Sequence, residues 1–238
     1  MHRRGKKYQE AAKLVEVGKT YAPTEAVSLV KKVSYTSFAG TIELHLRMGL
    51  DPRHADQVVR GVALLPHGLG KPVRVLVFTS GEGIRLAEAA GADYVGSDDL
   101  IKRVEEGWLE FDVAIATPEV MANKVSRLGR VLGRKGLMPN PRSGTIVQPN
   151  DLARAVRDAR QGRVEFRLDK TGIIHVPVGK TDFEDQALLE NMASLIDAVQ
   201  KAKPTGAKGQ YVFTITVAPT MGPGVPLDLT QALALKVA

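Results

Sequence analysis

The sequence predicts an α/β and α+β two-domain protein, with an inserted α/β domain and an α+β base domain built from both chain ends. Short apolar runs alternate with helical segments in the middle of the chain, which is typical of a parallel sheet. Strands of alternating polar and apolar residues lie on both sides of this middle part, which is typical of antiparallel pairing. The 238 residues are also enough for two domains of ordinary size.

The first part, residues 1–67, is expected to supply helices and the first strands of the base domain. The predicted helices are residues 7–17 and 24–33, and the predicted strands are residues 41–50 and 57–65. In the first strand, five apolar side chains alternate with Thr41, Glu43, His45 and Arg47, which predicts one buried and one polar face. Asp51 and Pro52 then provide a turn.

The middle part, residues 68–159, is expected to form a Rossmann-like insert. Its predicted strands are residues 73–79, 93–96 and 111–117, and its predicted helices are residues 82–91, 98–107, 118–129 and 151–160. Strands and helices that alternate in units this short need parallel crossovers, which predicts a small doubly wound sheet. We expect hinges at residues 66–72 and near Gln161.

The last part, residues 160–238, is expected to complete the base domain. Residues 163–168 and 173–178 alternate around turn-forming residues, which predicts a hairpin. A helix is predicted at residues 183–201 and a strand at residues 210–217. The tail, residues 225–238, is apolar and fits no pattern, so a weak helix, a contact segment and a lineage extension all remain open.

Charge and composition point to a nucleic-acid partner in a reducing compartment. The net charge is +7, and residues 1–67 carry 11 Lys and Arg against 6 Asp and Glu. Clustered cations attract phosphate backbones. A second basic run, without acids between residues 120 and 150, is either a secondary phosphate contact or a solvated helix face; it comprises Lys124, Arg127, Arg130, Arg134, Lys135 and Arg142. The chain has no cysteine, no apolar run of membrane length and no apolar signal core, so we expect a soluble, cytoplasmic protein.

Catalytic, metal and cofactor motifs are incomplete throughout the sequence. The five histidines, His2, His45, His54, His67 and His175, show no metal-ligand spacing and are interpreted as ordinary polar residues. Gly81 and Gly83 lack the third glycine of a dinucleotide fingerprint, and Pro72 stands where a phosphate loop needs Ser or Thr. We therefore expect no catalytic residue, metal or cofactor. A nucleotide-dependent enzyme and a protein scaffold remain the competing functions.

Polar strand faces indicate where RNA would bind. Thr41, Glu43 and His45, with Arg163 and Arg167 and with Thr214 and Thr216, are expected to form one open sheet face. RNA is recognised through such hydroxyl, phosphate and shape contacts, although solvent-facing strand residues are polar in any protein. The loop Thr220–Gly224 after the last strand and Phe38 before the first strand add accessible amides and flat apolar contacts.

Five stretches that cover nearly the whole chain closely resemble the ribosomal protein L1 family, a bacterial large-subunit family of the mobile stalk beside the tRNA exit site. They are SFAGTIELHLRMGLDPRHADQVVRGVALLPHGLGK (37–71), GADYVGSDDLIKRVEEGWLEFDVAIATPEVM (91–121), LGRVLGRKGLMPNPRSGT (128–145), VEFRLDKTGIIHVPVGK (164–180) and TMGPG (220–224). The family often has Lys where this chain has Ser37, so this chain departs from the family pattern at one cationic position.

The resemblance implies a function and a set of RNA contacts. It implies a monomer within the ribosome that binds large-subunit ribosomal RNA at the stalk, assists release of deacylated tRNA from the exit site and represses its own operon by binding mRNA, with no membrane and no small-molecule substrate. The implied RNA-binding residues are Phe38, Thr41, Glu43, Arg167, Asp169, Lys170, Thr171, Thr214, Thr220, Met221 and Gly222.

Overall fold

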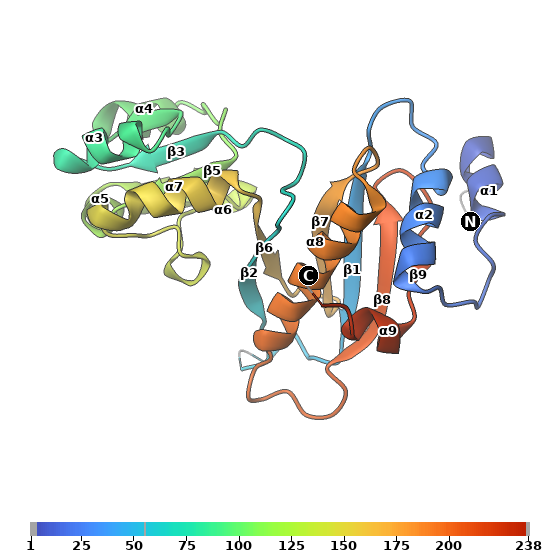
Figure 1. Cartoon of the computed structure of the whole chain (residues 1–238). Helices are drawn as coiled ribbons and strands as arrows, with labels where there is room; N and C mark the ends of the chain where they lie inside the picture. Colours follow the sequence, from blue (N-terminus) through green and yellow to red (C-terminus); the bar gives the residue numbers. More distant parts are fainter. Residues whose placement is uncertain (1–3, 55, 237–238) are drawn as a thin grey trace. The chain divides into compact units, whose positions relative to one another are not determined.

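The computed structural model describes residues 4–54 and 56–236, which divide into two compact units. Unit 1 combines both chain ends, Met1–Gly70 and Val164–Ala238, and unit 2 is the intervening Lys71–Arg163. Both units mix helices and strands (Figure 1). The predicted fold class is confirmed, and each unit is described by itself below.

Unit 1 is built around a mainly antiparallel sheet. Its strands are β1 (Thr41–Met48), β2 (Arg60–Leu64), β6 (Arg163–Arg167), β7 (Ile173–Lys180), β8 (Val212–Pro219) and β9 (Val225–Pro226). Its helices are α1 (Lys6–Ala12), α2 (Pro23–Val33), α8 (Asp185–Lys201) and α9 (Leu229–Leu233). Four strands form one sheet in the order β7-β1-β8-β9, and β1 pairs antiparallel with both neighbours.

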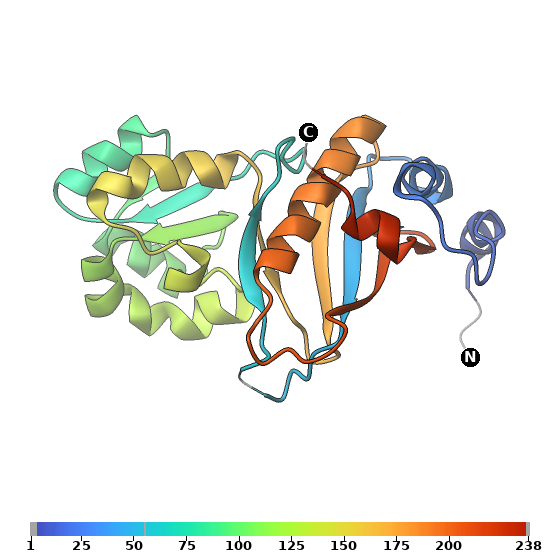
Figure 2. The ribbon, with the colours of Figure 1, turned by 60° about the horizontal axis from the view of Figure 1, so that its bottom comes forward.

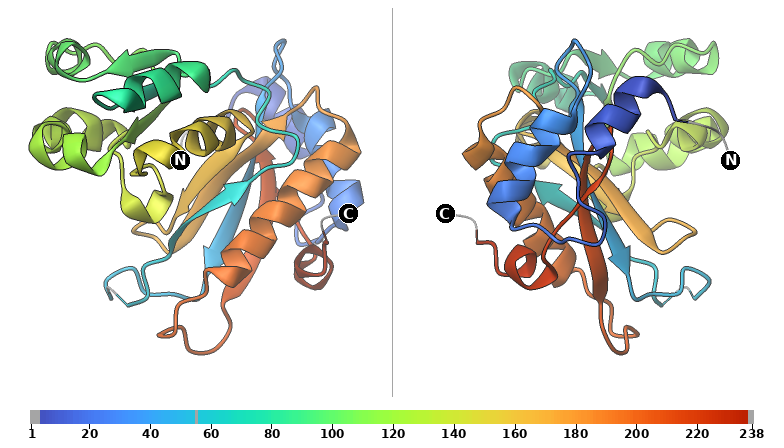
Figure 3. Two further views of the ribbon diagram at one scale, coloured as in Figure 1. Left: turned by 60° about the vertical axis from the view of Figure 1, so that its left-hand side comes forward. Right: turned by 90° about the vertical axis from the view of Figure 1, so that its right-hand side faces the viewer.

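The alternation of β1 decides which face of this sheet is covered. Ile42, Leu44, Leu46 and Met48 are buried and pack with α2 and α8, whereas the intervening side chains are more exposed. Figures 1 and 2 show α2 and α8 on the same side of the strands, and Figure 3 shows α8 running across that side. The helices of the described part of unit 1 therefore cover one face of the sheet and leave the other face open.

The predicted hairpin of residues 163–168 and 173–178 is wrong in its pairing. β6 pairs with β2 in a separate two-stranded sheet, whereas β7 pairs with β1. β6 and β7 meet only through a single bridge between Leu168 and Ile174 in the described part of the chain. Leu168 also donates its backbone N–H to the carbonyl of Val59, just before β2. The strand before the turn therefore follows β2, and the described residues form no hydrogen-bonded ladder between β6 and β7.

Unit 2 is a doubly wound α/β unit with a parallel sheet in the order β4-β3-β5. Its strands are β3 (Val75–Phe78), β4 (Tyr94–Gly96) and β5 (Val113–Ala116). One face packs against α3 (Glu82–Ala89) and α7 (Leu152–Arg160), and the other against α4 (Asp98–Glu105), α5 (Pro118–Asn123) and α6 (Gly129–Lys135) (Figure 2). The short helical turns are η1 (Val125–Leu128), η2 (Pro141–Ser143) and η3 (Pro149–Asp151).

Two predicted helices differ from the structure. The first ends at Ala12, after which the backbone N–H groups of residues 13–15 donate three residues back instead of four, and that of Glu16 donates to the Tyr21 hydroxyl at 2.9 Å. The helix expected over residues 118–129 breaks at Lys124, whose φ of −130° leaves helical geometry. This break brings the Lys124 ammonium to Asp98 at 2.8 Å and buries both Val125 and Leu128.

The apolar tail is part of the core of unit 1. β9 pairs with β8, Leu227 is 3% exposed, and Tyr21 forms a bridge with Leu227. Asp228 caps α9 by accepting a hydrogen bond from the backbone N–H of Gln231 at 2.9 Å. Of the readings left open for residues 225–238, a short helix is observed over Leu229–Leu233.

Candidate nucleic-acid interface

The helix-free face of the four-stranded sheet carries a row of polar side chains, which we call the open face. On β1 these are Thr41, Glu43, His45 and Arg47. Strand register places His175 of β7 opposite His45, Thr216 of β8 on the other side of His45, and Thr214 opposite Arg47. The open face therefore runs the full length of β1 and is flanked by hydroxyls and imidazoles.

One end of the open face is organised by Thr220, directly after β8. Its backbone N–H donates to the Thr41 carbonyl at 2.9 Å, and its hydroxyl donates to the Glu43 carboxylate. Thr41, Glu43 and Thr220, with their neighbours Phe38, Met221 and Gly222, are called the first cluster. Its hydrogen bonds hold the Glu43 carboxylate and the Thr220 hydroxyl in fixed positions, and such groups recognise sugar and base edges.

Exposed apolar side chains stand beside these polar groups. Phe38 is 66% exposed and Met221 is 52% exposed, so both apolar side chains are accessible to a partner. Gly222 allows this loop to approach the rest of unit 1, since a Cβ there would lie 2.5 Å from the Pro219 ring and 3.1 Å from the Val33 carbonyl oxygen. The first cluster thus offers flat surfaces for base or sugar contacts next to hydrogen-bonding groups.

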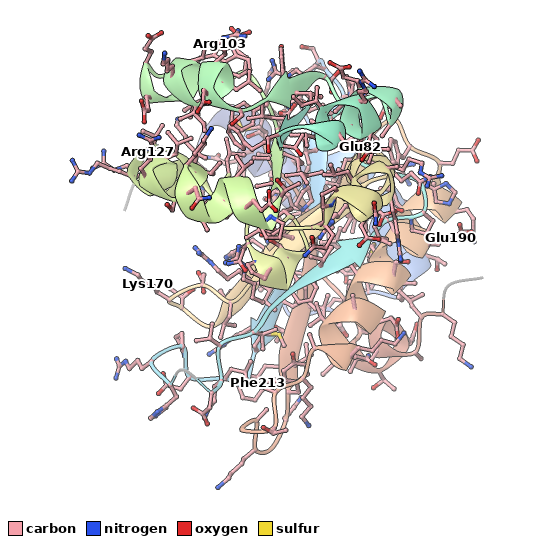
Figure 4. The ribbon with its side chains drawn as sticks, turned by 90° about the vertical axis from the view of Figure 1, so that its left-hand side faces the viewer. Glu82, Arg103, Arg127, Lys170, Glu190 and Phe213 are labelled. Atoms are coloured by element: carbon pink, nitrogen blue, oxygen red, sulfur yellow. The ribbon has the colours of Figure 1, made fainter. Side chains whose placement is uncertain are left out.

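The other end of the open face is a basic hollow. We call its members Arg47, Arg53, Lys170, Thr171 and Phe213 the second cluster. Lys170 stands at the tip of the loop between β6 and β7, and Phe213 lies at the start of β8 (Figure 4). Three cations and one aromatic ring, 45% exposed, suit phosphates and a stacked base. Arg53 and Phe213 were not among the residues expected from the sequence.

Asp169 shapes the loop that carries Lys170 and Thr171. Its carboxylate accepts hydrogen bonds from the Thr171 hydroxyl and from the backbone N–H groups of Thr171 and Ile173, each at 2.8 Å. These donors, the Thr171 hydroxyl foremost, lower the pKa of Asp169 from 3.8 to about 2. Asp169 therefore acts as a scaffold of the turn, and Lys170 and Thr171 are left exposed beside it.

The expected residues do not all come together. Arg167 is exposed at the end of β6 and Arg163 begins that strand, so the expectation that both share the sheet face with β1 is wrong. Their strand belongs to the two-stranded sheet because it pairs with β2. Thr214 lies near the second cluster, six strand residues or roughly 20 Å along β1 from Thr41.

The basic run in unit 2 contains one ion-paired residue and four exposed cations, of which Arg127 donates its Nε–H to the Lys124 carbonyl at 3.2 Å. Lys124 contacts Asp98 and Ser97, whereas Arg127, Arg130, Arg134 and Lys135 are exposed on η1 and α6. Arg130 and Arg134 are four residues apart on α6 and share one helix face, and Arg127 projects outward (Figure 4). Arg142 belongs to η2, and its side chain lies outside the described part of the structure.

The histidines form no metal site among the residues that the structure describes, and the same holds for every cluster of His, Asp and Glu there. His67 contacts Glu190, His54 lies near Asp51, and His45 pairs with His175. His2 lies outside the described residues. None of the helices in the described part of the chain combines the length and apolarity of a membrane span.

Comparison with known proteins decides the family. The model of the Ribosomal protein L1p/L10e family matches residues 30–223, which includes β1, the whole of unit 2 and the Thr220 loop. The chain belongs to this family. It is 58% identical to the large ribosomal subunit protein uL1 of Dehalococcoides mccartyi strain 195 over 98% of each chain, and 57% identical to that of Chloroflexus aggregans over the full length of both.

Family membership confirms three predictions from the sequence. The resemblance to the L1 family was correct. The protein is a structural protein of the ribosome and not an enzyme. Its location is the ribosome, which is cytoplasmic in bacteria. The nucleotide-dependent enzyme suggested by unit 2 is thereby set aside, because the fold of a unit does not decide its function.

Proposed function

We propose that the chain is a constituent of the large ribosomal subunit that binds ribosomal RNA at the mobile stalk through the open face of unit 1. The observation that carries the proposal is the fixed arrangement of Thr41, Glu43 and Thr220 beside exposed Phe38 and Met221. Such a surface binds structured RNA through sugar hydroxyls, base edges and stacking. The relatives are named as large-subunit proteins, which supports the same partner.

The two clusters would have different roles in RNA recognition. The second cluster, with Arg47, Arg53 and Lys170, supplies phosphate contacts that hold the RNA in register. The first cluster supplies few charges and many fixed hydrogen-bonding groups, so it would provide the selectivity. Asp169 then contributes indirectly, by shaping the loop that carries Lys170.

Two further RNA partners extend this proposal. The exposed cations Arg127, Arg130, Arg134 and Lys135 of unit 2 would contact tRNA that leaves the exit site, and the proposal includes Lys124 and Arg142 of the same basic run. Repression of the chain's own operon would use the open face on an mRNA segment that resembles the ribosomal site. One face then serves both RNAs, so ribosomal RNA and mRNA compete for it.

A charge substitution in the first cluster tests the proposal. We expect Met221→Glu to weaken binding of a stalk-region ribosomal RNA transcript by about 1 to 3 kcal/mol, because it replaces an apolar contact with a charge that repels phosphates. Equilibrium binding on the transcript and on an unrelated hairpin measures the effect.

Val17→Glu is the matched control, since Val17 is fully exposed outside the open face and gains the same charge. We expect this variant to bind like the unmodified protein, and both variants to keep the circular dichroism spectrum. Equal binding of Met221→Glu and Val17→Glu would show that the first cluster does not touch the RNA.

A further inference from the structure

Two histidines face each other in the middle of the open face, between the two clusters. His45 and His175 occupy directly opposite positions on β1 and β7, and their Nδ1 atoms lie 2.8 Å apart. The ring centroids are 4.9 Å apart in an edge-on arrangement. The side chains are 26% and 49% exposed, so a ligand on the open face can reach both rings.

This contact fixes where the pair holds its protons. A neutral imidazole has one N–H and one bare nitrogen, so a nitrogen–nitrogen contact of 2.8 Å needs a single hydrogen between the two Nδ1 atoms. The donating ring then has a bare Nε2, and the accepting ring keeps its hydrogen on Nε2. One added proton converts the bare Nε2 into a second outward donor and gives the pair a positive charge.

Two carboxylates flank the pair, and neither forms a hydrogen bond with it. Glu43 lies 3.9 Å from His45 Nε2, and Asp169 lies 3.6 Å from His175 Nε2, both too far for a hydrogen bond. Each carboxylate already accepts from a threonine, Glu43 from Thr220 and Asp169 from Thr171. Neither Nε2 has a hydrogen bond within the described part of the chain, so both can contact another molecule, and the carboxylates lower the cost of a positive charge beside them.

Among the residues around the pair, the two histidines are the groups that can change charge near neutral pH. β8 brings the uncharged Thr216 opposite His45, and the cations Arg47 and Lys170 belong to the second cluster. Burial, and after it the neighbouring His175, lowers the pKa of His45 in spite of the opposing effect of Glu43. In the free protein His45 is thus uncharged at neutral pH, with the carboxylates of Glu43 and Asp169 on either side of the pair.

We infer that the His45–His175 pair is a subsite for backbone oxygens of RNA, and that RNA binds there together with one proton. The inference rests on the proposed function of the open face. A polyanion laid across Glu43 and Asp169 is repelled unless the pair becomes cationic, and the protonated pair offers Nε2 donors toward both sides. Binding of RNA therefore draws a proton onto the pair, and a lower pH strengthens the complex.

The pH dependence of binding tests this subsite. One linked proton changes the affinity by at most about tenfold per pH unit, and we expect the Kd for the stalk-region transcript to fall roughly three- to tenfold per unit between pH 7.5 and 5.5. His45→Gln and His175→Gln should each flatten this profile. Calorimetry at pH 7 in two buffers of different ionisation enthalpy should show proton uptake by the unmodified protein and almost none by either variant.

His67→Gln is the matched control, because His67 pairs with Glu190 of α8 and lies off the open face. It should keep the pH profile of the unmodified protein. A flat profile in the unmodified protein, or an unchanged slope in both pair variants, overturns the subsite while ordinary RNA binding upholds the proposed function. Loss of RNA binding by the unmodified protein at every pH overturns both.

Discussion

The Asp169 carboxylate fixes the conformation of the loop that carries Lys170 without itself serving as an RNA contact. Three hydrogen bonds from Thr171 and Ile173 tie it to the turn before β7. Its pKa is lowered to about 2, below the ordinary 3.8, so the folded state favours the charged form. The turn therefore gains stability at neutral pH, and this gain is lost as the pH falls from about 4 through about 2.

Titration of Asp169 tests whether these hydrogen bonds persist in solution. In a carboxyl-detected NMR titration we expect the Asp169 resonance to move with a midpoint near 2, whereas Asp169 in a Thr171→Val variant should titrate closer to 3.8 because its foremost donor is removed. Glu190, whose pKa His67 lowers, is an internal reference that Thr171→Val should leave unchanged. A midpoint near 4 in the unmodified protein would mean that these hydrogen bonds do not persist in solution.

At the same scale, Phe213 shows what the sequence could not predict. Strict alternation places Phe213 with Ile215 and Val217 on the buried side of the strand. The structure has a bulge here, since Arg47 pairs with Thr214 and the next residue, Met48, pairs with Val212. The bulge turns Phe213 outward beside Arg53. His175 was likewise unrecognised as a partner of His45, because the two residues are 130 positions apart.

Among the elements, the strands of the open face were predictable and their partners were not. The alternation of residues 41–50 depends on local residues and predicted β1 correctly. The pairing of β6 with β2 depends on which edge is available in three dimensions, which a hairpin pattern around Asp169 does not encode. Arg163 and Arg167 were therefore assigned to the wrong sheet, although their strand was predicted.

The C-terminal element makes a prediction about stability. Leu227 is buried against unit 1, and its backbone N–H donates to the Ile215 carbonyl at 2.9 Å. We expect Leu227→Ala to lower the free energy of unfolding of unit 1 by about 2 to 5 kcal/mol, because it opens a cavity in a packed core. Leu14→Ala, the same truncation at a side chain that is 53% exposed, should cost far less. Equal urea midpoints for the two variants would mean that the tail is not part of the core.

At the scale of the whole molecule, charge and selectivity belong to different surfaces. The basic excess lies in residues 1–67 and in the run around α6, whereas the first cluster is dominated by hydroxyls and a carboxylate. Phosphate contacts confer affinity and respond to salt, and groups fixed by hydrogen bonds confer preference for one RNA. We propose, from the two compact units, that unit 1 determines which RNA is bound and unit 2 adds affinity.

The most direct test removes unit 2 altogether. The chain enters and leaves unit 1 from β2 and β6, which are neighbours in one sheet, so a short Gly/Ser linker can replace residues 71–163. Binding curves are then measured for this shortened protein and the full chain on the stalk-region transcript and on an unrelated hairpin. We predict a weaker affinity and a shallower salt dependence with the preference for the stalk RNA retained. Loss of that preference in a shortened protein that is still folded by circular dichroism would contradict the assignment of RNA recognition to the open face.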